Sequence, residues 1–249
     1  MYARNAFAIA KALAASDASN VQARDDLIEA WATLGDSFRS TQPATASQCY
    51  RKAIALTRKM ADRDEARSWL SQLDLNLAAV LPGKQHLAER LNLLQEANKI
   101  RQELTSLTGP TYRLLLVQCY CTLSDAESEA GNLARAKQSA NSALPFFSEF
   151  KTTSPSLSVV RGVGLCYESM GNLERRIATD GSLSLSQRHA AQTESQEWYR
   201  KSLDAWSEWN KRGAATPESE LERRKVEDLL SSVSTYRSDR NARQAAHKE

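Results

Sequence analysis

The sequence is poor in the two residues that punctuate sheets and loops. Its 249 residues include only 9 glycines and 6 prolines. A many-stranded sheet needs turn residues at short intervals, and this chain has too few of them. Since 41% of its residues are hydrophobic, the chain can nevertheless bury a core. The composition therefore predicts an all-α fold.

Long apolar runs and an excess of one charge are also missing. A bilayer-spanning helix needs about 20 consecutive apolar residues, whereas "LNLAAVL" is among the longest apolar stretches here. The 33 Lys and Arg nearly balance the 30 Asp and Glu, without a sustained basic run. Counterion release, which drives binding to nucleic acids, then has no obvious source. We expect neither membrane insertion nor a nucleic-acid partner.

The sequence has no cluster of cysteines and histidines at the spacing that a metal or cofactor site would need. The four cysteines are scattered, and even Cys119 and Cys121 would point about 200° apart on a helix. His86, His189 and His247 lie in separate segments without a Cys or carboxylate at ligand spacing. We therefore predict reduced, buried thiols in a cytoplasmic protein, surface histidines, and no cofactor.

A repeated pattern of apolar and small residues runs along the chain. Around "EAWATLGDSFRS" the apolar residues recur at intervals of three and four positions. In the next segment an alanine, a tyrosine and a second alanine recur at the same intervals. The first copy of this pattern consists of Trp31, Leu34, Gly35, Phe38, Ala46, Tyr50 and Ala53. Such periodicity predicts pairs of helices that bury their apolar faces by stacking on the next pair.

Four helix pairs are predicted, together forming a single domain over residues 1–236. They span residues 22–61, 63–107, 111–148 and 156–212. Residues 216–236 are predicted to form a capping helix, with Thr216 as N-cap and Pro217 in the first helical position. Residues 237–249 are expected to form a polar, flexible tail.

The pattern resembles the tetratricopeptide repeat, although the units exceed the usual length of about 34 residues. The resemblance implies a right-handed α-solenoid whose first helices line a concave, peptide-binding face. Carried over position by position, it predicts ten partner-binding residues: Glu29, Asp36, Arg39, Gln72, Gln118, Asp125, Glu168, Asn172, Arg175 and Arg176.

A second resemblance concerns residues 2–38 and 197–213. The stretch "YARNAFAIAKALAASDASNVQARDDLIEAWATLGDSF" is similar to the long helical repeats of bacterial signalling proteins. The stretch "EWYRKSLDAWSEWNKRG" is similar to the end of the helical regions C-terminal to bacterial serine/threonine protein kinases. This resemblance implies a detached interaction region whose partners include a kinase domain in the parent protein. The chain itself lacks the glycine loop and acidic metal ligands of a kinase.

The glycines and aromatic residues of the pattern indicate contacts between helices and not a ligand-binding site. Gly35 corresponds to Ala78, Ser124 and Gly171 in the other copies, so a contact between helices is expected at this position. "RGVGLCY" lacks the third glycine of a dinucleotide loop. The aromatic residues Trp198, Tyr199, Trp206 and Trp209 are expected to be buried by the capping helix rather than exposed as a partner groove.

Two functions remain after these exclusions. The preferred interpretation is a non-catalytic scaffold that binds a protein or peptide on its concave face in bacterial signalling. The alternative is an enzyme whose site is assembled from distant residues, for example in the loop at 179–188. No catalytic motif in the sequence supports the alternative.

Overall fold

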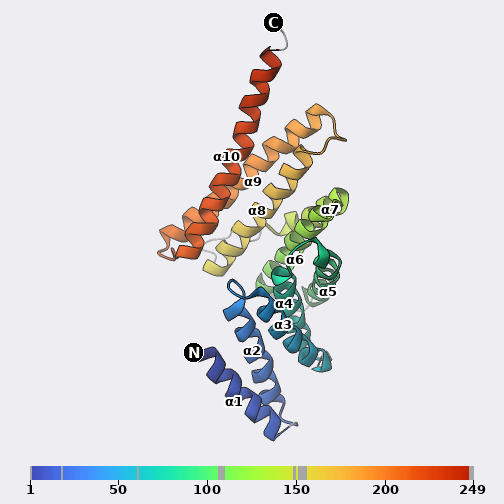
Figure 1. Ribbon diagram of the computed structural model, residues 1–249, viewed down its shortest axis with the longest axis vertical. Helices are drawn as coiled ribbons and strands as arrows, with labels where there is room; N and C mark the ends of the chain where they lie inside the picture. The colour runs from blue at the N-terminus through green and yellow to red at the C-terminus, as the bar shows by residue number, and fades with distance from the viewer. Residues whose placement is uncertain are drawn as a thin grey trace. The chain divides into compact units, whose positions relative to one another are not determined.

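The computed structural model describes residues 2–17, 19–60, 62–105, 110–147, 150 and 156–246. Within these residues the chain is all-helical and contains no strand, as the composition predicts (Figure 1). Contacts between residues gather into two compact units, residues 1–112 and residues 113–249. The sequence pattern instead predicts one continuous domain.

The first unit contains five α-helices and two short 3-10 helices. They are α1 (Tyr2–Ser16), α2 (Val21–Phe38), α3 (Pro43–Thr57), η1 (Arg58–Met60), α4 (Asp64–Val80), η2 (Lys84–His86) and α5 (Leu87–Thr105). Each α-helix packs against the next one along the chain. The predicted pairs at 22–61 and 63–107 therefore correspond to α2 with α3 and α4 with α5.

The helix starts in this unit follow from local chemistry. Asn20 caps α2, since its Oδ1 accepts a hydrogen bond of 3.0 Å from the backbone N–H of Ala23. Pro43 opens α3, a position where a missing N–H costs nothing.

Ion pairs of 2.5 Å from Arg51 to Glu89 and of 2.7 Å from Arg58 to Glu96 tie the α3–η1 segment to α5.

Gly35 has the packing role expected of it. A Cβ added to Gly35 would lie 2.7 Å from the ring of Tyr50, which is fully buried on α3. The Tyr50 hydroxyl donates a 2.7 Å hydrogen bond to Asp36. The absence of a side chain at residue 35 thus lets α2 and α3 approach closely.

In the described part of the second unit there are five α-helices. They are α6 (Pro110–Glu129), α7 (Leu133–Phe147), α8 (Leu157–Ala178), α9 (Leu185–Lys211) and α10 (Pro217–Ala246). Helices α8 and α9 lie side by side, and α10 packs on α9 (Figure 1). The predicted pairs at 111–148 and 156–212 correspond to α6 with α7 and α8 with α9.

The glycine contact of the first unit recurs between α8 and α9. A Cβ on Gly171 would lie 2.6 Å from the ring of Tyr199, whose hydroxyl donates to Asn172 at 2.9 Å. Ser195 and Ser202 of α9 donate to carbonyl oxygens of α8 at 2.8 Å each. Small residues and buried tyrosines therefore fix the same helix contact in both units.

The predicted aromatic cluster separates into two groups. Tyr199 and Trp206 are buried in a core that includes Val226 and Val233 of α10, and Trp209 packs against this core. Trp198 instead stacks on Tyr167, with ring centroids 5.7 Å apart, in a core formed with α6, α7 and α8. Burial by the last helix is thus correct for all but Trp198.

The last helix begins where the sequence predicts and ends later. The Thr216 hydroxyl accepts a 3.1 Å hydrogen bond from the backbone N–H of Ser219, which confirms the N-cap. Helix α10 continues through residue 246, past the end expected at 236, so most of the predicted flexible tail is helical. Residues 247–249, including His247, lie outside the described residues.

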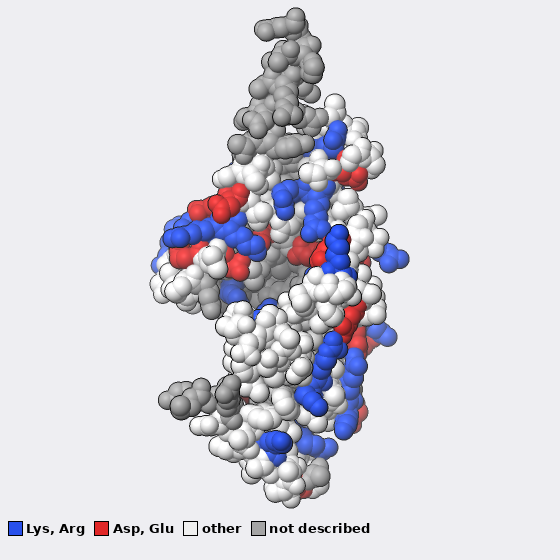
Figure 2. Space-filling view, viewed as in Figure 1, with Lys and Arg blue, Asp and Glu red and all other residues white. Residues whose placement is uncertain are grey.

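Several predictions from composition can be compared with the structure. All four cysteines are buried and free. Within the described part of the chain, no helix is long and apolar enough to cross a membrane, and no group of three or more His, Cys, Asp or Glu side chains is placed to hold a metal ion. On the face in view in Figure 2, basic and acidic side chains are interspersed.

Candidate functional site

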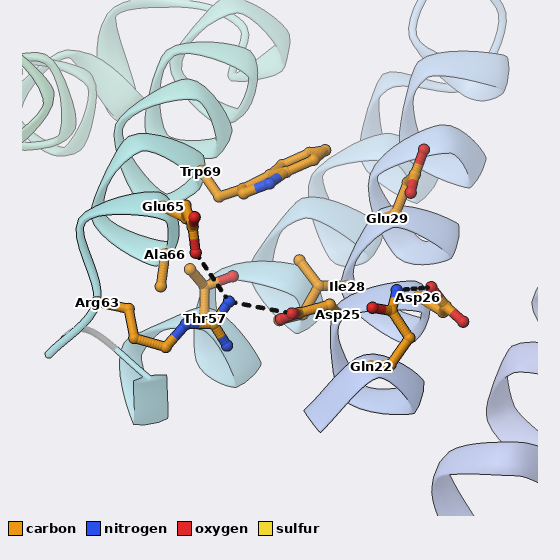
Figure 3. A pocket seen from close by; sticks show the side chains of 10 residues that line it. All are labelled: Gln22, Asp25, Asp26, Ile28, Glu29, Thr57, Arg63, Glu65, Ala66 and Trp69. Carbon is orange, nitrogen blue, oxygen red and sulfur yellow. Dashed lines mark hydrogen bonds and ion pairs between the residues drawn. The ribbon is translucent and has the colours of Figure 1, made fainter. Parts of the chain in front are cut away.

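A cavity of about 280 Å³ lies between the first halves of α2 and α4 in the first unit. Figure 3 shows its walls: Gln22, Asp25, Asp26, Ile28 and Glu29 from α2, Glu65, Ala66 and Trp69 from α4, Thr57 from α3, and Arg63 from the segment before α4. Both α2 and α4 are the first helices of their pairs. The cavity therefore lies on the kind of surface that the repeat pattern predicts to bind a partner.

The cavity carries four carboxylates and a single guanidinium. Nη2 of Arg63 lies 3.1 Å from Asp25 and 3.3 Å from Glu65, and these hydrogen bonds raise the pKa of Arg63 (Figure 3). Asp26 accepts a 2.8 Å hydrogen bond from the amide of Gln22. Glu29 is exposed and forms no ion pair among the described residues. The excess of carboxylates gives the cavity a negative potential.

Trp69 adds an aromatic surface to this acidic cavity. Its side chain extends from α4 toward α2, and Glu29 lies on the helix facing it (Figure 3). The indole remains 43% exposed, which is unusual for the largest apolar side chain. An exposed indole face beside carboxylates attracts cations both through its quadrupole and through the neighbouring charges.

A second groove of about 400 Å³ continues from the cavity toward α1. Asp26 and Glu29 line both spaces. On the far side of the groove, Ile9 and Leu13 of α1 are 62% and 50% exposed. An acidic cavity and an apolar groove therefore share one boundary on α2.

The structure places the predicted site residues of the first unit in different environments. Glu29 lines the cavity, whereas Asp36 accepts the hydroxyl of buried Tyr50 and so has an internal partner. Arg39 is exposed directly after α2. Gln72 is half-buried and donates to Asn76 at 3.1 Å. Of these four residues, Glu29 is the only one that lines the cavity.

Internal contacts engage most of the predicted residues of the second unit. Glu168 is buried and lies 2.8 Å from Nζ of Lys225 on α10. Burial and the charge of Glu168 raise the pKa of Asp125 to about 6, against the opposing effects of a hydrogen bond with Ser169 and of the charge of Arg176. The charges of Asp125, Glu168 and Arg176 thus influence one another within this unit.

The remaining three predicted residues lie elsewhere on the second unit. Asn172 accepts the Tyr199 hydroxyl. The amide of Gln118 lies against Gly162, where an added Cβ would be 2.6 Å away. Arg175 lines a separate cavity near the end of α8.

Sequence reasoning missed most of the cavity in the first unit. Asp25, Asp26, Arg63, Glu65 and Trp69 are not among the predicted site residues. One signal was present, because Trp69 lies at the edge of the apolar stripe formed by Leu70, Leu73 and Leu77 and not at its centre. A tryptophan at the edge of a buried stripe is only partly covered, so part of its ring stays exposed.

No family model matches. A search of curated proteins also finds no match. Among solved structures, the crystal structure of BtubC (BKLC) from P. vanneervenii is similar, at 15% sequence identity and a TM-score of 0.49. The match covers 96% of this chain and 90% of that one.

Proposed function

We propose that this chain is a non-catalytic scaffold of tetratricopeptide-like helix pairs, in which α10 serves as the capping helix. In this proposal the first helices line a concave face, and the cavity between α2 and α4 binds a basic segment of a partner protein in bacterial signalling. The juxtaposition of exposed Trp69 with unpaired Glu29 carries the proposal. Four buried, free thiols accord with a cytoplasmic setting.

The chemistry of the two adjoining spaces defines the bound segment. A Lys or Arg side chain fits the cavity, with its stem on the Trp69 indole and its cation near Glu29 and Asp26. A neighbouring apolar side chain of the same segment fits the groove beside Ile9 and Leu13. The expected partner sequence therefore combines a basic residue with an apolar one.

A peptide-binding measurement tests this function. Fluorescence polarisation with labelled peptides that carry Lys or Arg beside Leu is compared with peptides in which Glu replaces the basic residue. We expect the basic peptides to bind. We also expect Glu29→Lys and Trp69→Ala each to weaken binding about tenfold, since a desolvated cation–π contact and a close charge contribute roughly 1–2 kcal/mol each.

The control for this experiment is Glu197→Gln, which removes an exposed carboxylate of α9 in the second unit. Its affinity for the basic peptides should equal that of the wild type. Equal binding of acidic and basic peptides, or full affinity in both cavity variants, would show that the cavity is not the partner site.

A further inference from the structure

A second cavity, of about 190 Å³, lies in the second unit where α8 ends, α9 begins and α10 passes beside them. Its walls come from all three helices and from Thr179, directly after α8. The amide of Gln192 on α9 donates to the carbonyl oxygen of Val233 on α10 at 2.8 Å, which joins two of the walls. The cavity is thus defined by packed elements rather than by a loop alone.

Two arginines line this cavity, and each has one donor without a partner among the described residues. Nε of Arg175 and Nε of Arg188 are each buried and have no hydrogen-bond partner among the described residues. A buried guanidinium donor without an acceptor is costly, so such a donor indicates a missing acceptor. Because both side chains line one cavity, a ligand with several acceptor oxygens would pair with both guanidinium groups.

The charges around the cavity favour an anion. No Asp or Glu is among the described residues that line it, while His189 adds an imidazole beside the two guanidinium groups. Asp180, which is not one of the residues that line the cavity, interacts electrostatically with Arg188. The Tyr199 hydroxyl interacts with Arg175. These two groups do not balance the two positive charges. Arg188 also lies in the first turn of α9, where the helix dipole attracts negative charge.

Size and surroundings narrow the choice of anion. Ala178 and Val233 give the cavity an apolar wall, which strengthens charged contacts by lowering the local dielectric. The volume is below the range of about 300–1,000 Å³ typical of pockets for drug-sized ligands. A single tetrahedral oxyanion with a short stem fits better than a nucleotide, and paired guanidinium groups suit the oxygens of a phosphate.

We propose that this cavity binds a phosphate monoester through Arg175 and Arg188. The phosphate belongs either to a phosphorylated side chain of a protein segment or to a free small phosphate ester. The proposal is independent of the acidic cavity, which lies in the first unit.

Isothermal titration calorimetry tests the site with the full chain and four probes: inorganic phosphate, O-phospho-L-serine, and a phosphoserine peptide with its unphosphorylated form. We expect binding of O-phospho-L-serine and of the phosphopeptide but not of the unphosphorylated peptide. Arg188→Gln should weaken this binding at least tenfold, and Arg175→Gln should do the same. Arg200→Gln, which removes an exposed arginine of the same helix, should leave it unchanged.

The outcomes separate the possible ligands. Tighter binding of the phosphopeptide than of O-phospho-L-serine assigns the site to a protein segment, and equal binding assigns it to a small ester. Because Arg175 also contacts Tyr199, circular dichroism must show that the variants are folded, and Arg188→Gln is the decisive one. Absence of binding by all phosphate probes, or full affinity in folded Arg188→Gln, overturns the proposal.

Discussion

Asp74 is fully buried on α4, and neither of its carboxylate oxygens has a hydrogen-bond partner among the described residues. Burial and the charge of Glu96 together raise its pKa to about 7, against the opposing effect of Arg58. The ionised side chain is therefore unfavourable in the folded protein. Periodicity could not reveal this residue, because a polar position on a helix normally indicates a solvent-exposed face.

The pKa of Asp74 predicts that stability depends on pH. The folded-state value of about 7 exceeds the unfolded value of about 3.9, so the neutral carboxyl contributes stability that is complete below about pH 4. This contribution is lost as the pH rises through 7. We expect Asp74→Asn to raise the free energy of unfolding by roughly 1–3 kcal/mol at pH 8, and by less at pH 5.

Urea unfolding at pH 5, 6, 7 and 8 measures this effect. The wild type should lose stability over that range more steeply than Asp74→Asn does. Asp62→Asn changes an exposed aspartate and should follow the wild type. Identical pH slopes for the wild type and Asp74→Asn would contradict the assignment.

At the scale of helices, local sequence predicted the all-helical character of the chain but not the division of its helices into two compact units. The α2–α3 and α8–α9 pairs follow from apolar spacing and from small residues opposite Tyr50 and Tyr199. The end of α10 was missed because "SDRNARQAA" has no apolar stripe, although Arg, Gln and Ala are good helix formers.

The candidate site shows where this kind of prediction stops. Glu29 was found because its place in the repeat indicates an outward face. Trp69 and Arg63 were not found, because a cavity between two helix pairs depends on how the pairs pack. Asp36 and Asn172 occupy equivalent outward positions, yet each accepts a buried tyrosine hydroxyl, which only the tertiary contact reveals.

The glycine contact between α8 and α9 predicts the sign of a substitution. Alanine normally stabilises a helix interior by about 1 kcal/mol relative to glycine. In Gly171→Ala, however, the new methyl group would lie 2.6 Å from the buried ring of Tyr199. Since overpacking costs about 1–3 kcal/mol, we expect a net loss of stability in urea unfolding.

Gly181→Ala is the matched control for this substitution. A Cβ at residue 181 would meet nothing within 4 Å. Its free energy of unfolding should stay within about 0.5 kcal/mol of the wild type. A stabilised Gly171→Ala protein would mean that α8 and α9 do not make the close contact described here.

For the molecule as a whole, a net charge of +3 provides little long-range attraction for either sign of ligand. The charged side chains within each cavity must then determine which ligand binds there. The first unit carries the acidic cavity with Glu29, and the second carries the cavity with Arg175 and Arg188. One chain thus presents two candidate sites of opposite sign.

This arrangement predicts two independent binding activities. Glu29→Lys should weaken the binding of basic peptides about tenfold and leave the affinity for O-phospho-L-serine within about twofold, since the two cavities share no residue. Arg188→Gln should weaken the binding of O-phospho-L-serine and leave the affinity for basic peptides within about twofold. Measuring both ligands on both variants tests this expectation. A loss of both activities in either variant would indicate that the substitution disturbs the fold.

The burial of all four native thiols has a practical consequence for probe chemistry. Burial raises the pKa of Cys49, and the contact with the Cys166 thiol together with burial raises the pKa of Cys121. Both shifts disfavour the reactive thiolate, and burial also limits access to it. A cysteine introduced at an exposed position such as Arg200 would therefore react with a maleimide first under native conditions. Because the fold shields all four natural thiols, a fluorescent label can be attached at one chosen site without removing the natural cysteines.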